Sequence, residues 1–191
     1  MVGNIPNYNR VDILRCFLKL SWGIGRQELA KELALGEGTV RTILGILKSK
    51  KLISSNKKGH FLSKKGSDML YEIMLSVSMP KAVTAKTLYP EYKKVGVHIK
   101  NAPALKEIYK LRDIAVKNGA EVALILKFQN RLYAPEAGIE QDFEKLEEHF
   151  DLRNGDVLII GFSDNKRYAE NGALSIAVEL SSVLKKFIKK L

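Results

Sequence analysis

The stretch between residues 23 and 64 limits the fold of this 191-residue chain more than any other part of it. Apolar residues recur there first at helical spacing and then in the alternation of short strands. The pattern predicts a helix over residues 24–33, a turn over 34–36, a second helix over 36–48, and a hairpin whose strands 51–55 and 60–62 flank the turn Asn56-Lys57-Lys58-Gly59. An earlier helix is expected to begin at Asn9 and Asp12, which have the spacing of a capping box.

Helix, turn, helix and β-hairpin in this order form the winged variant of the helix-turn-helix, which binds duplex DNA. The run Leu29-Ala30, Leu33, Thr39-Val40-Arg41, Leu44, Leu47 and Lys51-Leu52-Ile53 resembles the pattern of bacterial and archaeal winged-helix transcription regulators. Leu62-Ser63-Lys64-Lys65-Gly66 is similar to the sequence that leads out of the wing in that family. The resemblance covers roughly residues 9 to 76 and implies an N-terminal DNA-binding domain.

The second predicted helix offers the side chains that would contact DNA. If Val40, Ile43 and Leu47 face the core, Arg41 and Thr42 face outward with the glycines at 38 and 45. An arginine on that face suits bidentate contact with guanine or a phosphate, and a glycine lets a backbone come close; close helix–helix packing is the alternative reason for Gly45. The residues predicted to contact DNA are Arg26, Gly38, Thr39, Arg41, Thr42, Lys48, Lys57, Lys58 and His60.

The net charge of +11 is concentrated at the N-terminal end. Residues 1–80 contain 13 Lys and Arg against 6 Asp and Glu, a net of +7, whereas residues 81–191 contain 19 against 15, a net of +4. A basic surface attracts a polyanion such as DNA and makes the affinity depend on salt. Lysines that only keep the protein dissolved are the alternative, and we favour that alternative for the lysines near the C-terminus.

Two domains are expected, with residues 1–80 as the DNA-binding domain, 81–90 as a linker and 91–191 as a second domain. The second part predicts strands over 94–100, 122–126, 131–133 and 156–161 and helices over 105–118, 139–150 and 171–190. The strand over 156–161 is the most apolar and is expected at the centre of its sheet. The predicted fold class is therefore α+β, a winged helix-turn-helix followed by a small α/β domain with a mixed sheet.

The loop after that apolar strand is the candidate small-molecule site of the second domain. Ligands in open α/β sheets collect where strands end and helices begin. The residues predicted to bind a ligand are Gly161, Ser163, Asp164 and Asn165, together with Arg112 and Asp113 from the helix over 105–118. A solvated turn, in which Ser163 or Asp164 caps the next helix, is the alternative.

Several classes of function lack a supporting motif. There is no glycine-rich dinucleotide motif, no phosphate-loop lysine motif and no Ser/His/Asp set, so we expect no enzyme activity and no cofactor. The three histidines are scattered without metal-ligand spacing, so we expect no metal. A single cysteine, no apolar run long enough to span a bilayer and no secretory pattern predict a cytoplasmic protein without a membrane partner.

The last helix predicts a homodimer. Ala173, Ala177, Leu180, Leu184, Phe187 and Leu191 recur at spacings of four and three, as in a coiled-coil seam. The alternative is that this helix covers its own sheet.

The whole layout resembles archaeal winged-helix proteins with an uncharacterised C-terminal α/β domain, a likeness that rests in the second part on Gly155-Asp156, Ile159-Ile160-Gly161 and Gly172-Ala173. It implies a transcription regulator that binds duplex DNA and whose second domain senses a small-molecule effector, dimerises, or does both. The alternative function is a small-molecule-binding protein or enzyme whose winged helix mediates protein contacts.

Overall fold

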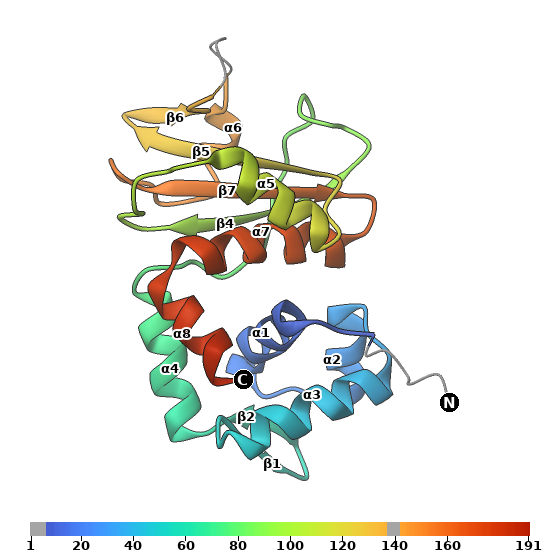
Figure 1. Cartoon of the computed structure of the whole chain (residues 1–191). Helices are drawn as coiled ribbons and strands as arrows, with labels where there is room; N and C mark the ends of the chain where they lie inside the picture. Colours follow the sequence, from blue (N-terminus) through green and yellow to red (C-terminus); the bar gives the residue numbers. More distant parts are fainter. Residues whose placement is uncertain (1–6, 137–141) are drawn as a thin grey trace. The chain divides into compact units, whose positions relative to one another are not determined.

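The structure is a computed structural model that describes residues 7–136 and 142–191. The contacts between residues divide the chain into two compact parts. The first ends at Glu72 and also includes Lys186–Leu191. We call the two parts unit 1 and unit 2 (Ile73–Lys185). Helices and a hairpin come before a five-stranded sheet with helices (Figure 1), which confirms the predicted α+β class.

Unit 1 has the predicted order of helices followed by a hairpin. Its elements are α1 (Arg10–Lys19), the 3-10 turn η1 (Leu20–Trp22), α2 (Arg26–Leu33), α3 (Glu37–Ser49), β1 (Ile53–Asn56), β2 (Gly59–Leu62) and α4 (Lys64–Met74). The capping box of α1 is confirmed, because Asp12 N donates to Asn9 Oδ1 at 2.9 Å and Asn9 N donates to Asp12 Oδ2 at 3.1 Å. The core is mostly apolar, with Asp12 and Arg15 buried in it, and the ring centroids of Phe187 and Phe17 lie 4.8 Å apart.

The hairpin is joined to the start of α2 by a further pair of backbone bonds. Ile24 and His60 exchange two N–H···O bonds of 3.0 Å each, so the chain before α2 adds a short antiparallel bridge to β2. Gly59 has a φ of +131°, and a Cβ there would lie 2.7 Å from Ile24 O. This position therefore requires glycine.

The exit from the hairpin shows why the motif Leu62-Ser63-Lys64-Lys65-Gly66 has its spacing. Ser63 Oγ donates to Lys51 O at 2.7 Å and accepts from Gly66 N at 3.1 Å. A Cβ at Gly66 would lie 2.0 Å from Leu52 O. The serine ties the start of α4 to the end of α3, and the glycine allows the two backbones to touch.

Unit 2 is built on one five-stranded sheet. Its elements are β3 (Lys81–Ala82), β4 (Lys93–Ile99), α5 (Ile108–Lys117), β5 (Val122–Gln129), β6 (Arg131–Tyr133), α6 (Glu144–Glu147), β7 (Val157–Ser163) and α7 (Lys166–Leu180). The strand order is β3-β4-β7-β5-β6, which confirms that the most apolar strand is central. The sheet is not mixed as predicted, because each pairing of its described strands is antiparallel. Strand periodicity alone carries no information about strand direction.

The two faces of this sheet are covered differently (Figure 1). Helices α5 and α7 pack on one face, and α7 approaches β7 so closely that a Cβ at Gly161 would lie 2.1 Å from Ala169 O. The other face carries an apolar cluster that includes Val83, Phe143, Leu146 and Phe162. That cluster is closed by α6 and by the chain between β3 and β4. The segment expected as a linker over 81–90 thus contributes a strand and core residues.

Two predicted helices have different bounds. The helix predicted over 171–190 is two helices, α7 and α8 (Ser182–Lys190), because Ser181 adopts an extended backbone and its Oγ accepts from Leu184 N at 3.3 Å. The helix predicted over 139–150 is the four-residue α6, with residues 139–141 outside the described part. Across the described residues, no helix combines the length and the apolar character that a membrane crossing needs.

Candidate nucleic-acid interface

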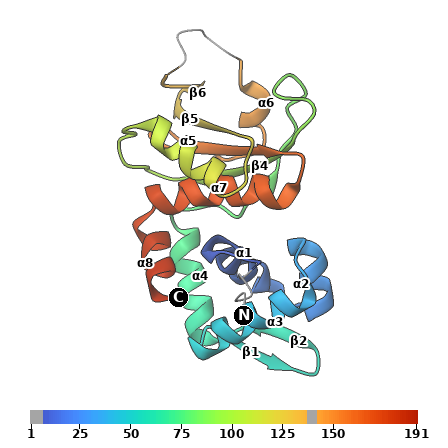
Figure 2. The ribbon, with the colours of Figure 1, turned by 45° about the vertical axis from the view of Figure 1, so that its right-hand side comes forward.

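Helix α3 has one buried face and one exposed face. Val40, Ile43, Leu44 and Leu47 are buried, as the apolar spacing predicted. The exposed face carries Gly38, Arg41, Thr42, Gly45 and Lys48, whereas Thr39 is half-buried at its flank. Figure 2 shows the hairpin β1–β2 beside this helix.

The two glycines of α3 face open space. No described atom lies within 4 Å of a Cβ built at Gly38 or Gly45. Close helix–helix packing within the described chain therefore does not account for Gly45, although glycine inside a helix costs about 1 kcal/mol relative to alanine. Thr42 Oγ1 donates to Gly38 O at 3.2 Å, which holds its side chain close to the helix backbone. The face between Gly38 and Gly45 is thus smooth apart from Arg41.

The start of α2, the end of α3 and the hairpin bring three basic side chains together. Burial lowers the pKa of His60 below 6.5, and the nearby charges of Lys48 and then Arg26 lower it further. His60 Nδ1 and Ser55 Oγ are hydrogen-bonded at 2.8 Å. These three residues come from separate elements, and each is among those predicted to contact DNA.

Arg26 also meets the acidic residue at the start of α3. Its NH2 group lies 3.4 Å from Glu37 Oε2 in a half-exposed ion pair. Its Nε is buried and has no hydrogen-bond partner among the described residues. The pair offsets the negative charge that Glu37 would otherwise add to this surface.

The turn of the hairpin carries two further lysines. Lys57 and Lys58 are exposed, and Lys58 N donates to Asn56 Oδ1 at 2.8 Å, which fixes the turn. In the described part of the chain, no carboxylate lies within ion-pair distance of Arg41, Lys48, Lys57 or Lys58. We call α3, the hairpin and Arg26 together the basic surface of unit 1.

The comparisons with known proteins match the two parts of the chain separately. Residues 11–68 match the model of the N-terminal domain of PH0730-like proteins, and residues 91–180 match a domain of unknown function, DUF4443. The solved structure of the hypothetical protein PH0730 from Pyrococcus horikoshii OT3 is similar at 28% identity, with a TM-score of 0.79. The alignment covers 94% of this chain and 99% of that one. No curated protein matches the chain.

These matches confirm the expected likeness to an archaeal protein of two domains. The names of these families and of this protein give no ligand, reaction or partner. Membership of the winged-helix transcription regulators therefore stays a prediction that rests on the residues.

Several of the six residues predicted to bind a small molecule have structural roles of their own. Arg112 NH1 lies 3.1 Å from Glu136 Oε2, and Asp113 is exposed. Gly161 is covered by α7, which accounts for its lack of a side chain.

The polar loop after β7 is folded on itself. Ser163 is buried, and its Oγ donates to Asp164 Oδ1 at 3.2 Å and accepts from Asn165 N at 3.3 Å. Asn165 caps α7 by accepting from Arg167 N at 2.9 Å. These bonds describe a helix-capping turn in which the cap is Asn165, whereas the predicted alternative was a cap at Ser163 or Asp164.

Two other features of unit 2 were not predicted from the sequence. Lys86, Lys93, Lys94 and Lys166 line one pocket, and His98 Nε2 lies 2.8 Å from Asp156 Oδ2 inside the protein. His98 and Asp156 are 58 residues apart, and Lys166 joins the pocket from a distant part of the sequence, so no local spacing signals either arrangement. Among the described residues, no three His, Cys, Asp or Glu side chains gather as a metal site would require.

Proposed function

We propose that unit 1 binds duplex DNA through its basic surface and that the chain is a transcription regulator. The observation that carries this proposal is the exposed face of α3, on which Arg41 and Lys48 have no acidic partner among the described residues and Gly38 and Gly45 leave open space. A helix of this kind fits the major groove, where an arginine can contact guanine O6 and N7. The half-exposed ion pair of Arg26 keeps Glu37 from repelling phosphates.

The hairpin gives this surface a second contact. Lys57 and Lys58 stand at its turn, where they can reach phosphates on either side of the groove that α3 occupies. His60 joins Arg26 and Lys48 between the helix and the hairpin. Phosphate contacts of this kind set register and supply affinity, while base contacts from α3 set sequence preference.

Salt dependence tests the phosphate contacts. We expect Lys57→Ala with Lys58→Ala to weaken binding to every duplex and to lower the slope of log K against log salt by about 2, because each phosphate contact contributes about 0.9. Fluorescence anisotropy with labelled duplexes measures both quantities. Lys189→Ala with Lys190→Ala is the matched control, since it removes two exposed charges of the same unit that belong to α8 rather than to α3 or the hairpin. Equal effects of the two pairs, or no salt-dependent binding by the wild type, would contradict the proposal.

The variant Arg41→Ala tests whether α3 contributes to sequence preference. It should weaken binding to a selected site by about 1–3 kcal/mol and binding to unrelated DNA much less. Site selection from random duplexes with the purified protein supplies the preferred sequence. A uniform loss on all sequences would make Arg41 a phosphate contact instead.

For unit 2 we propose ligand sensing, dimerisation, or both, without a catalytic step. A homodimer would let two basic surfaces bind two half-sites, which raises affinity without new contacts. Ala173 and Ala177 are fully buried, and α7 packs on β4 and β7, so a dimer would use another surface than the seam predicted from them. A pocket of unit 2 that is lined by lysines favours the sensing role, and it would also serve the alternative of a small-molecule-binding protein.

A further inference from the structure

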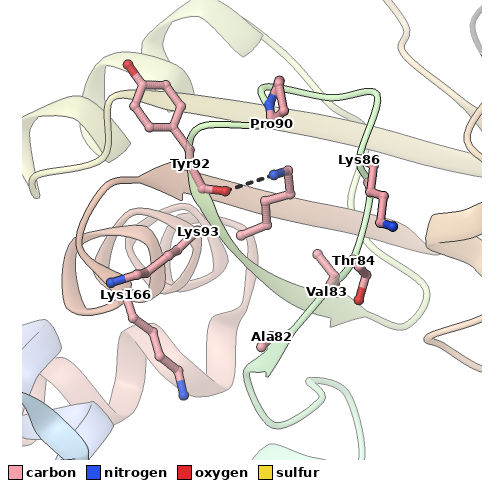
Figure 3. A pocket seen from close by; sticks show the side chains of 10 residues that line it. Ala82, Val83, Thr84, Lys86, Pro90, Tyr92, Lys93 and Lys166 are labelled. Atoms are coloured by element: carbon pink, nitrogen blue, oxygen red, sulfur yellow. Dashed lines mark hydrogen bonds between the residues drawn. The ribbon is translucent and has the colours of Figure 1, made fainter.

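Unit 2 contains a pocket of about 530 Å³ beside the start of β4. Four lysines line it, namely Lys86, Lys93, Lys94 and Lys166, and no acidic side chain is among its lining residues (Figure 3). We call it the lysine pocket. We propose that it binds a small organic molecule through a phosphate group. The proposal names a ligand class for the sensing role of unit 2 and does not depend on DNA binding by unit 1.

The wall of the lysine pocket is held in place by the core beneath it. Val83 and Ala85 are buried, and Val83 N donates to Lys94 O at 3.1 Å. Thr84 N donates to His149 Nε2 at 3.2 Å, which ties this segment to the loop before β7. A pocket that is already formed binds with a smaller entropic penalty than one that must fold around its ligand.

Lys94 is the most unusual of the four lysines because its side chain is buried. It is 8% exposed, and its Nζ donates to Tyr89 O at 2.9 Å and to Tyr92 O at 2.8 Å, the second bond being drawn in Figure 3. In the described part of the chain it has no carboxylate within ion-pair distance. Two carbonyls hold the ammonium group but do not neutralise it. Burial of an unpaired charge disfavours folding, and an anion in the pocket would supply the missing counter-charge.

The other three lysines are exposed around the same opening. Lys86 lies on the loop between β3 and β4, Lys93 begins β4 and Lys166 is the first residue of α7. The N-terminal end of a helix adds partial positive charge to that side. None of these three has an ion-pair partner among the described residues.

The chemistry of the lining selects the class of ligand. Lysine binds phosphate as a point charge, and a phosphate monoester carries a charge of about −1.5 to −2, more than one carboxylate would supply against four cations. The alanines at 82 and 85, Val83 and Pro90 line the rest of the pocket with apolar surface. Its volume is in the range of small-molecule sites. Both features favour a phosphorylated organic molecule over free phosphate.

Calorimetric titration of the full chain without DNA tests this inference. The probes are inorganic phosphate, AMP and ATP at low salt, so that free phosphate and organic phosphates are compared directly. We expect saturable binding of one organic phosphate per chain and weaker binding of inorganic phosphate. Lys86→Gln with Lys166→Gln should weaken that binding at least about tenfold, because both lysines make charge-assisted contacts.

The matched control is Lys106→Gln with Lys117→Gln. Both residues are exposed lysines of unit 2 outside the pocket, so the change in net charge is the same. Unchanged affinity in this control supports the lysine pocket. Equal weakening by both pairs, or no saturable binding of any probe, overturns it.

Duplex DNA is the competing ligand for the same lysines. If Lys86→Gln with Lys166→Gln lowers DNA affinity while no probe binds, these lysines contact nucleic acid and the inference is overturned. Because the titration contains no DNA, its failure leaves the proposed function of unit 1 standing. Loss of DNA binding by the unit 1 variants would, conversely, leave the lysine pocket intact.

Discussion

Each unit of the chain holds a buried aspartate, and the two aspartates find their partners over different distances along the sequence. In unit 1, Asp12 Oδ1 accepts from Arg15 NH1 at 3.0 Å, three residues away on the same helix. In unit 2, Asp156 Oδ2 lies 2.8 Å from His98 Nε2, 58 residues away on another strand. The buried carboxylate of unit 1 is thus paired within one helix turn, whereas that of unit 2 is paired only once the sheet has formed.

The cations of the two proposed binding sites are also arranged differently. Those of the basic surface of unit 1 lie mostly between Arg41 and His60, on one helix and the hairpin that follows it. The lysine pocket of unit 2 gathers residues from 86, 93, 94 and 166. Cations spread over an exposed helix face suit a long polyanion, and cations around a hollow suit a small one.

The largest expected effect would come from breaking the long-range pair of unit 2. Asp156→Ala should lower the free energy of unfolding by about 3–5 kcal/mol, because it leaves the buried ring nitrogen of His98 and neighbouring backbone groups without their hydrogen-bond partner. Asp156 also accepts from Asn101 N at 2.9 Å and Arg153 N at 2.8 Å, so two backbone N–H groups lose their acceptor. Urea denaturation followed by circular dichroism measures the loss.

Acid unfolding checks the same pair without a mutation. Burial alone would raise the pKa of Asp156, but hydrogen bonds from Asn101 N, Arg153 N and His98 lower it overall below 3.8. A lowered pKa means that the stabilisation is complete above the pKa of the unfolded chain and is lost as the pH falls through the folded value. Asp156→Asn should therefore flatten the acid limb of the stability curve. If the acid limb of the stability curve is unchanged in this variant, the His98–Asp156 pair does not contribute to the stability of unit 2 as proposed.

Features that depend on residues close in sequence could be predicted, and features that depend on distant residues could not. The cap of α1, the exposed face of α3 and the hairpin turn were predicted, because each depends on residues a few positions apart. Gly66 was recognised as part of a motif. The structure gives the physical reason for a glycine there, because a Cβ would collide with Leu52 O. Most of the basic surface follows from these local elements.

Unit 2 was predicted less completely because its decisive contacts are long-range. Apolar alternation located the strands but not their antiparallel order, and nothing near His98 or Lys94 in sequence indicates what surrounds them. The break at Ser181 had a local signal, since serine is a common helix cap, but the apolar spacing on either side favoured one helix. A residue pattern can thus locate an element without fixing its partners.

A smaller effect is expected from the open glycine on α3. Gly45→Ala should raise the free energy of unfolding by up to about 1 kcal/mol, because alanine favours the helix and its methyl group meets no described atom. The same change should weaken DNA binding if the backbone of α3 approaches the duplex there. Denaturation and anisotropy on one preparation separate the two effects.

Ser49→Ala serves as the control on the same helix, since Ser49 is exposed and its Oγ bonds only to Ile46 O among the described partners. A Gly45→Ala protein that is more stable and binds DNA as tightly as the wild type would remove backbone approach from the proposal. The difference between Gly45, which faces open space, and Gly161 of unit 2, which is covered by α7, would then concern stability alone.

The smallest effect should come from His60, and it concerns the charge of the basic surface itself. Burial and the charges of Lys48 and Arg26 lower its pKa below 6.5, so the imidazole is neutral in the free protein at neutral pH. Phosphates of bound DNA would favour the protonated form, so binding should take up protons and strengthen as the pH falls from 7 towards 5. One titrating group changes the affinity by less than about tenfold per pH unit.

Anisotropy at constant ionic strength measures this slope, and His60→Gln should flatten it. His149→Gln, which replaces a histidine of unit 2, should leave the slope unchanged if the titration belongs to the basic surface. The sign is opposite for folding: a lowered histidine pKa makes the unfolded chain bind the proton more readily, so the contribution of His60 to stability decreases as the pH falls below 6.5. Tighter DNA binding over a pH range in which the protein becomes less stable would show that the proton acts at the interface. A slope that His60→Gln does not alter would assign the pH dependence to another group and remove His60 from the DNA contact.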